Sequence, residues 1–184
     1  MAAGASQPGD AVTSLGSTVA IKMLSKVRVE DASRGVYSHR LWASGDENSQ
    51  DKALWLVGGA SNVGCAVLRS EGFTPDELES LSVEIDPEAD SPLSYYPLTK
   101  AGERFPSCDP SRKPCLEPKP DSRRDYLHGI LQGIAQVEKT GYAVLEDLGA
   151  DPLRAVLTAG GGSRNDMWTA MRQRMLGVPV RKAK

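Results

Sequence analysis

The residues whose type and spacing point most directly to chemistry are three consecutive glycines, Gly160, Gly161 and Gly162. They follow an apolar run, Ala155 to Ala159, which predicts a β-strand, and they precede a helical pattern that starts at Ser163. In such an arrangement, backbone that carries no side chain can approach a phosphate or a flat base. The helix would add unpaired N–H groups and the positive end of its dipole. The alternative is a turn that only joins the strand to the helix.

A second small-residue turn, Gly16-Ser17-Thr18, lies between two strand candidates, Ala11 to Leu15 and Val19 to Leu24. The hydroxyl groups of Ser17 and Thr18, together with backbone N–H groups, can hold phosphate oxygens at such a turn. The alternative is a plain hairpin in which the glycine supplies a positive φ.

The cysteines and histidines do not predict a metal site, because their spacing matches no metal-binding pattern. The residues compared are Cys108, Cys115, His39 and His128, and Cys65 is the third cysteine. An odd number of cysteines in a chain of this length favours a reducing compartment over a disulfide framework.

Composition narrows the class of protein further. A chain of 184 residues with 40% hydrophobic content predicts one globular domain. Its 22 basic and 24 acidic residues nearly balance and form no basic block, so no nucleic-acid partner is predicted. The longest apolar runs are too short to cross a membrane, so no membrane partner is predicted either.

The elements that must position the two turns are read from hydrophobic periodicity. Two further strands, over 35–41 and 53–57 with a hairpin loop over 43–52, indicate an antiparallel or mixed sheet. A helix is predicted over 63–69 with Ser61 or Asn62 as its cap. Another begins after Thr74, which is followed by a proline in the first turn.

The longest predicted helix runs from Arg123 to about Leu148. Ser122 and Asp125 resemble a capping box at its start, and Gly149 is its C-terminal cap. Its apolar stripe consists of Leu127, Ile130, Leu131, Ile134, Val137, Leu145 and Leu148. His128 and Gln132 lie beside the stripe, and we expect them to be partly buried with satisfied hydrogen bonds.

Most prolines fall in residues 86–120, which we interpret as a long irregular connection. Within it, Glu103 and Arg104 are expected to form an ion pair that locks the loop, with direct substrate contact as the alternative. Beyond the glycines, Met167, Met171 and Met175 form a helical stripe that is typical of core filler. Gly177 should cap that helix before a strand that begins at Val178.

Taken in order, these motifs resemble the FGGY carbohydrate kinases, sugar kinases of the actin-like ATPase superfamily. PGDAVTSLGST is similar to the family's phosphate hairpin, and GGASNVGCAVLR to the segment after its central strand. YYPLTKAGERFP is similar to its LPYLSGERTP loop, and YLHGILQGIAQVEKTGYAVLEDLG to its long helix. GGGSRNDMWTAMRQRMLGVPV resembles its adenosine motif. The details look closest to the ribulose and xylulose kinase-like branch of plants and cyanobacteria.

The resemblance covers residues 1–184 and implies an α/β fold, a mixed sheet with flanking helices, as in the ribonuclease H-like C-terminal domain of that family. It implies ATP and Mg²⁺ as cofactors and a sugar as substrate. The family's phosphate-contacting threonine falls at Ser17, with Thr18 beside it. Its nucleotide glycine falls at Gly161, and its polar residue near adenine at Asn165. Asn62 falls near the other side of the nucleotide.

The chain also departs from the family pattern. The position of the family's general-base aspartate lies before Met1, so no catalytic residue is predicted, and the domain is expected to be incomplete, cut at both ends. We therefore expect a parent protein that phosphorylates a pentulose, such as ribulose or xylulose, while the chain itself supplies the nucleotide-binding half and has little activity.

Two other functions are compatible with parts of the sequence. In the first, the chain is a non-catalytic fragment that binds a partner or a full-length kinase, with self-association through the incomplete domain. In the second, it is a dinucleotide fold, which G-x-G-x-x-G would mark and which this sequence does not satisfy. The predicted location is the cytoplasm, or a plastid if the parent carries a transit peptide.

Overall fold

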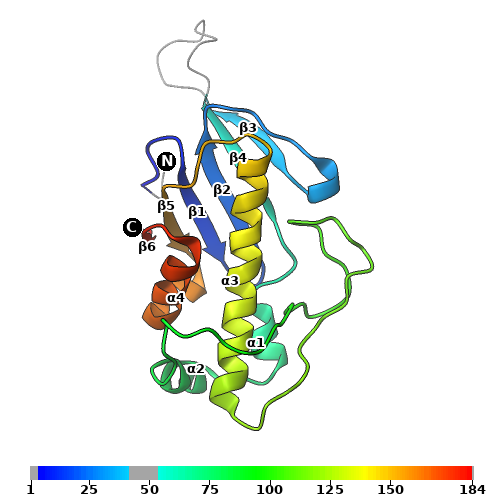
Figure 1. Cartoon of the computed structure of the whole chain (residues 1–184), viewed down its shortest axis with the longest axis vertical. Helices are drawn as coiled ribbons and strands as arrows, with labels where there is room; N and C mark the ends of the chain where they lie inside the picture. Colours follow the sequence, from blue (N-terminus) through cyan, green and yellow to red (C-terminus); the bar gives the residue numbers. More distant parts are fainter. Residues whose placement is uncertain (1–3, 42–53, 184) are drawn as a thin grey trace, which may run out of the picture.

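The computed structural model describes residues 4–41 and 54–183, which form a mixed sheet with helices (Figure 1). The six-stranded sheet has the order β3-β4-β2-β1-β5-β6. β1 pairs antiparallel with β2 and parallel with β5, which confirms the predicted mixed α/β class. The strands are β1 (Asp10–Leu15), β2 (Val19–Ser25), β3 (Tyr37–Leu41), β4 (Leu54–Ala60), β5 (Ala155–Ala159) and β6 (Val180–Lys182).

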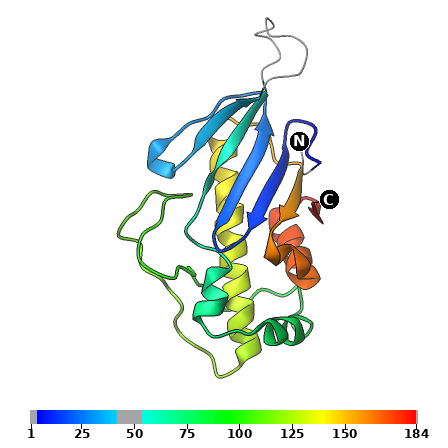
Figure 2. The ribbon, with the colours of Figure 1, turned by 180° about the vertical axis from the view of Figure 1, so that it is seen from behind.

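One long helix, α3, covers a face of this sheet. It lies in front of the strands in Figure 1 and behind them in Figure 2. Helices α1, α2 and α4 lie around α3 at the sheet end where β1 finishes, whereas the turn η1 lies beside β3 (Figure 1). The helices are α1 (Ala66–Ser70), α2 (Pro75–Ser82), α3 (Arg123–Asp147) and α4 (Asp166–Leu176), with 3-10 turns η1 (Ala32–Arg34) and η3 (Gly161–Arg164).

The core lies between α3 and the sheet because both present apolar faces of the expected period. Ala11, Thr13 and Leu15 alternate along β1 and are buried, whereas Val12 and Ser14 between them are partly exposed. The predicted α3 stripe is confirmed, with Leu148 half-buried and its other members buried. The methionines of α4 also fill the core, Met171 completely and the other two in part.

The predicted strand boundaries need three corrections. β3 begins at Tyr37 instead of residue 35, because Gly35 has a φ of 69° and ends the η1 turn. β4 runs past Val57 to Ala60, since its glycines continue the ladder with β2. β6 begins at Val180 instead of residue 178. The predicted hairpin loop over 43–52 lies outside the described residues.

Helix starts were predicted with mixed success. Thr74 forms a capping box with Glu77 at the start of α2, and Ser122 accepts from the Asp125 N–H at the start of α3. The helix predicted over 63–69 begins only at Ala66, and its N-cap Cys65 makes no side-chain capping bond.

The two glycine caps were predicted correctly, but the start of α4 was not. Gly149 and Gly177 have positive φ values just beyond α3 and α4. However, α4 begins at Asp166 instead of residue 163, because η3 stands between it and the strand.

Residues 86–120 contain isolated bridges and no named helix or strand. The connection lies against α3 where that helix lacks side chains. A Cβ atom at Gly133 would stand 2.8 Å from the Tyr95 carbonyl oxygen. A Cβ atom at Gly141 would stand 2.6 Å from the ring of Phe105. The glycines of α3 therefore form a groove for this segment.

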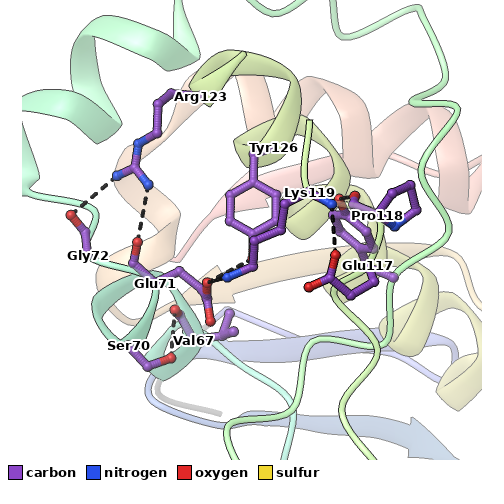
Figure 3. A network of polar contacts seen from close by, with 10 residues as sticks. Val67, Ser70, Glu71, Gly72, Glu117, Pro118, Lys119, Arg123 and Tyr126 are labelled. Carbon is purple, nitrogen blue, oxygen red and sulfur yellow. Dashed lines mark hydrogen bonds and ion pairs between the residues drawn. The ribbon is translucent and has the colours of Figure 1, made fainter. Parts of the chain in front are cut away.

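The far end of the connection is held by Glu71, which follows α1 (Figure 3). The Lys119 ammonium and the Tyr126 hydroxyl both donate to Glu71 Oε2, at 2.7 and 2.8 Å. The guanidinium of Arg123 donates to the carbonyl oxygens of Glu71 and Gly72. Lys119 and Tyr126 lower the pKa of Glu71, with the hydrogen bond from Lys119 as the largest cause. These contacts tie the end of the connection and the start of α3 to α1.

The two polar residues beside the α3 stripe differ in their hydrogen bonding. Gln132 is satisfied, since its side chain accepts from the Ser91 N–H and donates to the Ser91 carbonyl. His128 does not meet the prediction, because its Nε2 atom is buried without a hydrogen-bond partner. Burial also lowers the pKa of His128.

Candidate functional site

The hydroxyl turn and the glycine turn lie side by side at one end of the sheet. β1 and β5 are parallel neighbours, so their C-terminal ends reach the same edge. A Cβ atom at Gly160 would stand 2.6 Å from the Leu15 carbonyl oxygen, and Gly160 has a φ of 88°. Because both the space and the backbone angle exclude a side chain, glycine is required here. The fold therefore brings together the two turns that the sequence singled out.

The start of α1 holds the hydroxyl turn from the other side. The N–H of Cys65 donates to the Gly16 carbonyl at 2.9 Å, and that of Ala66 donates to the Ser17 carbonyl at 3.2 Å. The side chains of Ser17 and Thr18 are exposed. Backbone bonds thus fix the turn while its hydroxyls face solvent, where phosphate oxygens could reach them.

The glycine turn forms a tight 3-10 turn, η3, before α4 begins. Gly160 and Gly161 are exposed, and Gly162 is half-buried. The N–H of Ser163 donates to the Gly160 carbonyl at 3.2 Å, and the buried Ser163 hydroxyl donates to the same oxygen at 2.7 Å. The expectation that α4 begins directly after the glycines is therefore wrong, since their exposed backbone belongs to the turn η3.

Asn165 joins the glycine turn to two helices. Its Oδ1 atom accepts from the Trp168 N–H at 2.9 Å and so caps α4. Its Nδ2 atom donates to the Ser82 hydroxyl at 2.7 Å, at the end of α2. An amide side chain has two N–H groups and two lone pairs on oxygen. Asn165 therefore keeps one donor and one acceptor site for a ligand while it serves as a cap.

Asn62 lies beside the hydroxyl turn, because its neighbours Ser61 and Val63 bond to the backbone of Val19. The Asn62 side chain donates to the Gly102 carbonyl at 3.0 Å, and its N–H donates to Glu103 at 2.7 Å. The positions predicted to contact a nucleotide thus gather at one end of the sheet. Two of them, Asn62 and Asn165, also have structural hydrogen bonds that the sequence did not indicate.

Glu103 anchors the irregular connection, but not in the way that was predicted. Its carboxylate is buried and accepts from the Ser61 hydroxyl at 2.7 Å and from the Tyr96 hydroxyl at 2.9 Å. The Arg104 side chain is exposed and makes no ion pair with Glu103, and of Arg104 only the backbone N–H donates to that carboxylate. The expected ion pair is therefore replaced by hydrogen bonds, because neutral donors already surround this carboxylate.

A buried charged network lies under the two turns, and the sequence analysis missed it. Arg172 of α4 donates to both carboxylate oxygens of Glu138 of α3, at 2.6 and 2.7 Å. Each side chain is only 1% exposed. The network extends to both strands, since the Thr13 hydroxyl donates to Glu138 at 2.5 Å and Arg172 donates to the Thr158 hydroxyl at 2.9 Å. Tyr142 completes it with a 2.7 Å bond to Thr13.

One signal could have revealed this network from sequence. Glu138 follows Ile134 by one helical turn and precedes Tyr142 by another, so it belongs to the buried face of α3. A carboxylate on such a face requires a buried donor. Arg172 also lies near Cys65, where its charge opposes the effect of burial, which raises the pKa of that thiol to about 11.

The described residues do not offer a magnesium site of their own. They contain no group of three or more His, Cys, Asp or Glu residues arranged to hold a metal. Glu103, the buried acid nearest to Asn62, already accepts several hydrogen bonds. In nucleotide sites a Mg²⁺ ion is commonly held by substrate phosphates together with one or two carboxylates.

A separate pocket of about 540 Å³ lies between the irregular connection and α3. Tyr96, Arg112 and Thr140 are among its lining residues, and Glu103 forms part of its wall. Of the described residues predicted to bind a nucleotide, none lines this pocket. The candidate site is therefore the exposed surface at the two turns and not this hollow.

The mixed sheet with two turns at one end defines a class, the actin-like ATPase domains of α/β type. Residues 11–184 match the model of the FGGY family of carbohydrate kinases, C-terminal domain. The chain belongs to this family.

Solved structures share the fold at low sequence identity. A xylulose kinase from Rhodospirillum rubrum is 22% identical with a TM-score of 0.74, over 97% of this chain and 36% of that one. A gluconate kinase from Lactobacillus acidophilus is 17% identical with a TM-score of 0.75, over 97% and 36%. Plasmodium falciparum glycerol kinase with ADP is 15% identical with a TM-score of 0.69, over 95% and 35%.

This chain therefore spans about a third of the length of these kinases. Within 4–41 and 54–183, no helix is both long and apolar enough to cross a membrane.

Proposed function

We propose that this domain supplies the nucleotide half of an ATP-dependent sugar kinase that phosphorylates a pentulose such as ribulose or xylulose. The observation that carries the proposal is the contact between the hydroxyl turn and the glycine turn in a domain of the FGGY family. The xylulose kinase among the similar structures supports the sugar class, and the glycerol kinase with ADP supports the nucleotide. The resemblance to the plant and cyanobacterial ribulose and xylulose kinases, and with it a cytoplasmic or plastid location, remains part of the proposal.

In this proposal each side chain has a limited task. Ser17 and Thr18 donate hydrogen bonds to phosphate oxygens, and the exposed backbone at Gly161 lets the nucleotide approach the turn. Asn165 uses its remaining donor and acceptor on the base. Phosphoryl transfer depends mainly on positioning and charge stabilisation, and fixing two reactants can contribute roughly 7–11 kcal/mol of the barrier. The rest of the kinase provides the sugar site and the general base.

Calorimetry with ATP and ADP tests this proposal. The chain is compared with a Ser17→Ala/Thr18→Val double variant, which removes exposed hydroxyls without touching the core. A Thr99→Val variant is the control, because Thr99 is exposed in the irregular connection. We expect the double variant to bind ATP about tenfold more weakly and the control to bind as the wild type does. Absence of ATP binding by the wild type would contradict the proposal for this chain.

A coupled assay for sugar-dependent ADP release tests the reaction itself. Ribulose and xylulose are each offered with ATP, and glycerol serves as the comparison. We expect little or no turnover by this chain, because no residue in it is assigned as the general base. Turnover at a rate typical of kinases would show that the chain contains a complete catalytic site.

The alternative function is a non-catalytic domain that binds a partner or a full-length kinase. The exposure of Val27 (46%) and Tyr37 (40%) near the edge strand β3 favours it, since edge strands and exposed apolar side chains promote association. Size-exclusion chromatography over a range of concentrations distinguishes the two. A size that grows with concentration supports association, and a constant monomer counts against it.

A further inference from the structure

The buried Glu138–Arg172 pair is placed where it can control the geometry of the two turns. Thr13 and Thr158, the two strand residues that it contacts, stand directly opposite each other in the parallel β1–β5 ladder. Both are almost completely buried, at 0% and 1% exposure. β1 runs on from Thr13 into the hydroxyl turn, and β5 runs on from Thr158 into the glycine turn. The network therefore holds both strands by hydrogen bonds just before they end in the two exposed turns.

Stability alone is a weak explanation for such a pair. Removing two charges from water is costly, and well-packed apolar residues of similar volume often serve a core equally well. Unlike apolar packing, a charged pair is directional, because a guanidinium and a carboxylate form hydrogen bonds in a common plane. Here Arg172 meets Glu138 through two bonds and Thr158 through a third, so the position of each partner is specified.

We propose that Glu138, Arg172, Thr13 and Thr158 are positioning residues for nucleotide binding. They fix the position of the end of β5 relative to the end of β1. The hydroxyl turn and the glycine turn then face the same phosphates. This inference rests on the proposed function, since it assigns the network to the same site. None of the four residues touches the nucleotide.

The test removes each strand's link to the pair and leaves the pair itself intact. Thr158→Val and Thr13→Val delete one hydroxyl each at nearly constant volume, and Thr158→Ser keeps the hydroxyl. Ser25→Ala is the matched control. Ser25 is 0% exposed and donates to a carboxylate, that of Asp151, but it lies at the end of β2 away from the turns.

Two readouts separate positioning from stability. The first is hydrogen exchange of the Ser163 and Cys65 amides, whose bonds to Gly160 and Gly16 close the two turns. We expect exchange about tenfold faster in the valine variants than in Ser25→Ala, after correction for global stability. The second readout is ATP affinity, which we expect to fall about tenfold in the valine variants and to recover in Thr158→Ser. Exchange and affinity equal to those of Ser25→Ala would overturn the inference.

Hydrogen exchange is measured without a nucleotide. The positioning proposal can therefore be tested even if the proposed nucleotide binding is wrong. If the wild type does not bind ATP, the proposed function fails, while turn exchange still decides whether the network positions the turns. A Glu138→Leu/Arg172→Met variant provides a second decision. A stable fold with faster turn exchange supports positioning, and a stable fold with unchanged exchange and affinity contradicts it.

Discussion

The side-chain amide of Asn165 lies 2.7 Å from the hydroxyl of Ser82, so the end of the glycine turn is tied to the end of α2. The same amide caps α4 through Trp168. A single residue thus combines an architectural task with the base contact that we propose. Substitutions that keep one task and remove the other can separate them.

Asn165→Ala should lower the free energy of unfolding by about 1 kcal/mol, the usual cost of losing a helix cap. Asn165→Asp keeps the cap through its carboxylate, which can also accept from the Ser82 hydroxyl, but it lacks the amide donor. We therefore expect Asn165→Asp to be nearly as stable as the wild type in urea unfolding and to bind ATP as weakly as Asn165→Ala. Full ATP affinity in Asn165→Asp would show that the amide donor has no part in binding.

Gly160→Ala should destabilise the fold by roughly 2 kcal/mol, because residue 160 has a φ of 88° and lacks space for a Cβ atom. Gly161→Ala is the matched control, since a Cβ atom at that position meets nothing within 4 Å. Thermal unfolding of the two variants measures the difference. Equal melting temperatures would mean that the glycine turn relaxes more easily than its contact with Leu15 indicates.

Glu103→Ala should lower the free energy of unfolding by about 3 kcal/mol, because the buried donor of Ser61 and the half-buried donors of Asn62 and Tyr96 would lose their acceptor. Glu84→Ala is the control, since Glu84 is exposed. The Glu103 variant should also move the Asn62 amide signal in a heteronuclear NMR spectrum. A loss no larger than that of the control would show that water replaces this carboxylate.

Acid should weaken the contacts between Glu71 and its partners. The pKa of Glu71 is lower in the folded chain than in a free glutamate, with the hydrogen bond from Lys119 as the first cause. This contribution to stability is therefore fully present above the ordinary glutamate pKa of about 4.3, and it is lost as pH falls towards the lower folded value. We expect Glu71→Gln to melt a few degrees below the wild type at pH 7.

The same difference should shrink between pH 4.5 and pH 3, as the wild-type carboxylate takes up a proton. Melting curves of both proteins across this range measure it. Arg28→Gln, which breaks an exposed pair with Glu30, is a control for general acid effects. A melting difference between Glu71→Gln and wild type that does not change with pH would argue against the charge of Glu71 as its source.

Much of the fold could be predicted because it depends on local patterns. Alternating apolar residues marked β1 and β2, and the regular stripe of α3 marked its buried face. The caps at Thr74 and Ser122 were also readable, since a cap needs only its own side chain and the next turn. The turns at residues 16–18 and 160–162 stood out by composition, and parallel pairing of β1 and β5 brings them together.

The parts that could not be predicted depend on distant partners. Ser61 or Asn62 was expected to cap α1, but the Ser61 hydroxyl donates to Glu103 and the Asn62 amide to Gly102, both about 40 residues further along the chain. The Glu103–Arg104 ion pair was inferred from adjacency, which says nothing about donors brought from elsewhere. Glu138 and Arg172 lie on different helices, so their pairing requires the packing angle of those helices to be known.

The glycine groove of α3 has a consequence for how the chain unfolds. The segment from Tyr95 to Phe105 has no ladder or helix of its own and rests on Gly133 and Gly141. Its backbone hydrogen bonds reach only neighbouring residues of the same connection, through two isolated bridges, so they add little support once α3 melts. We therefore expect the connection and the helix to open as one cooperative unit. Proteolysis within residues 95–105 should then report the opening of α3 and not local motion of a surface loop.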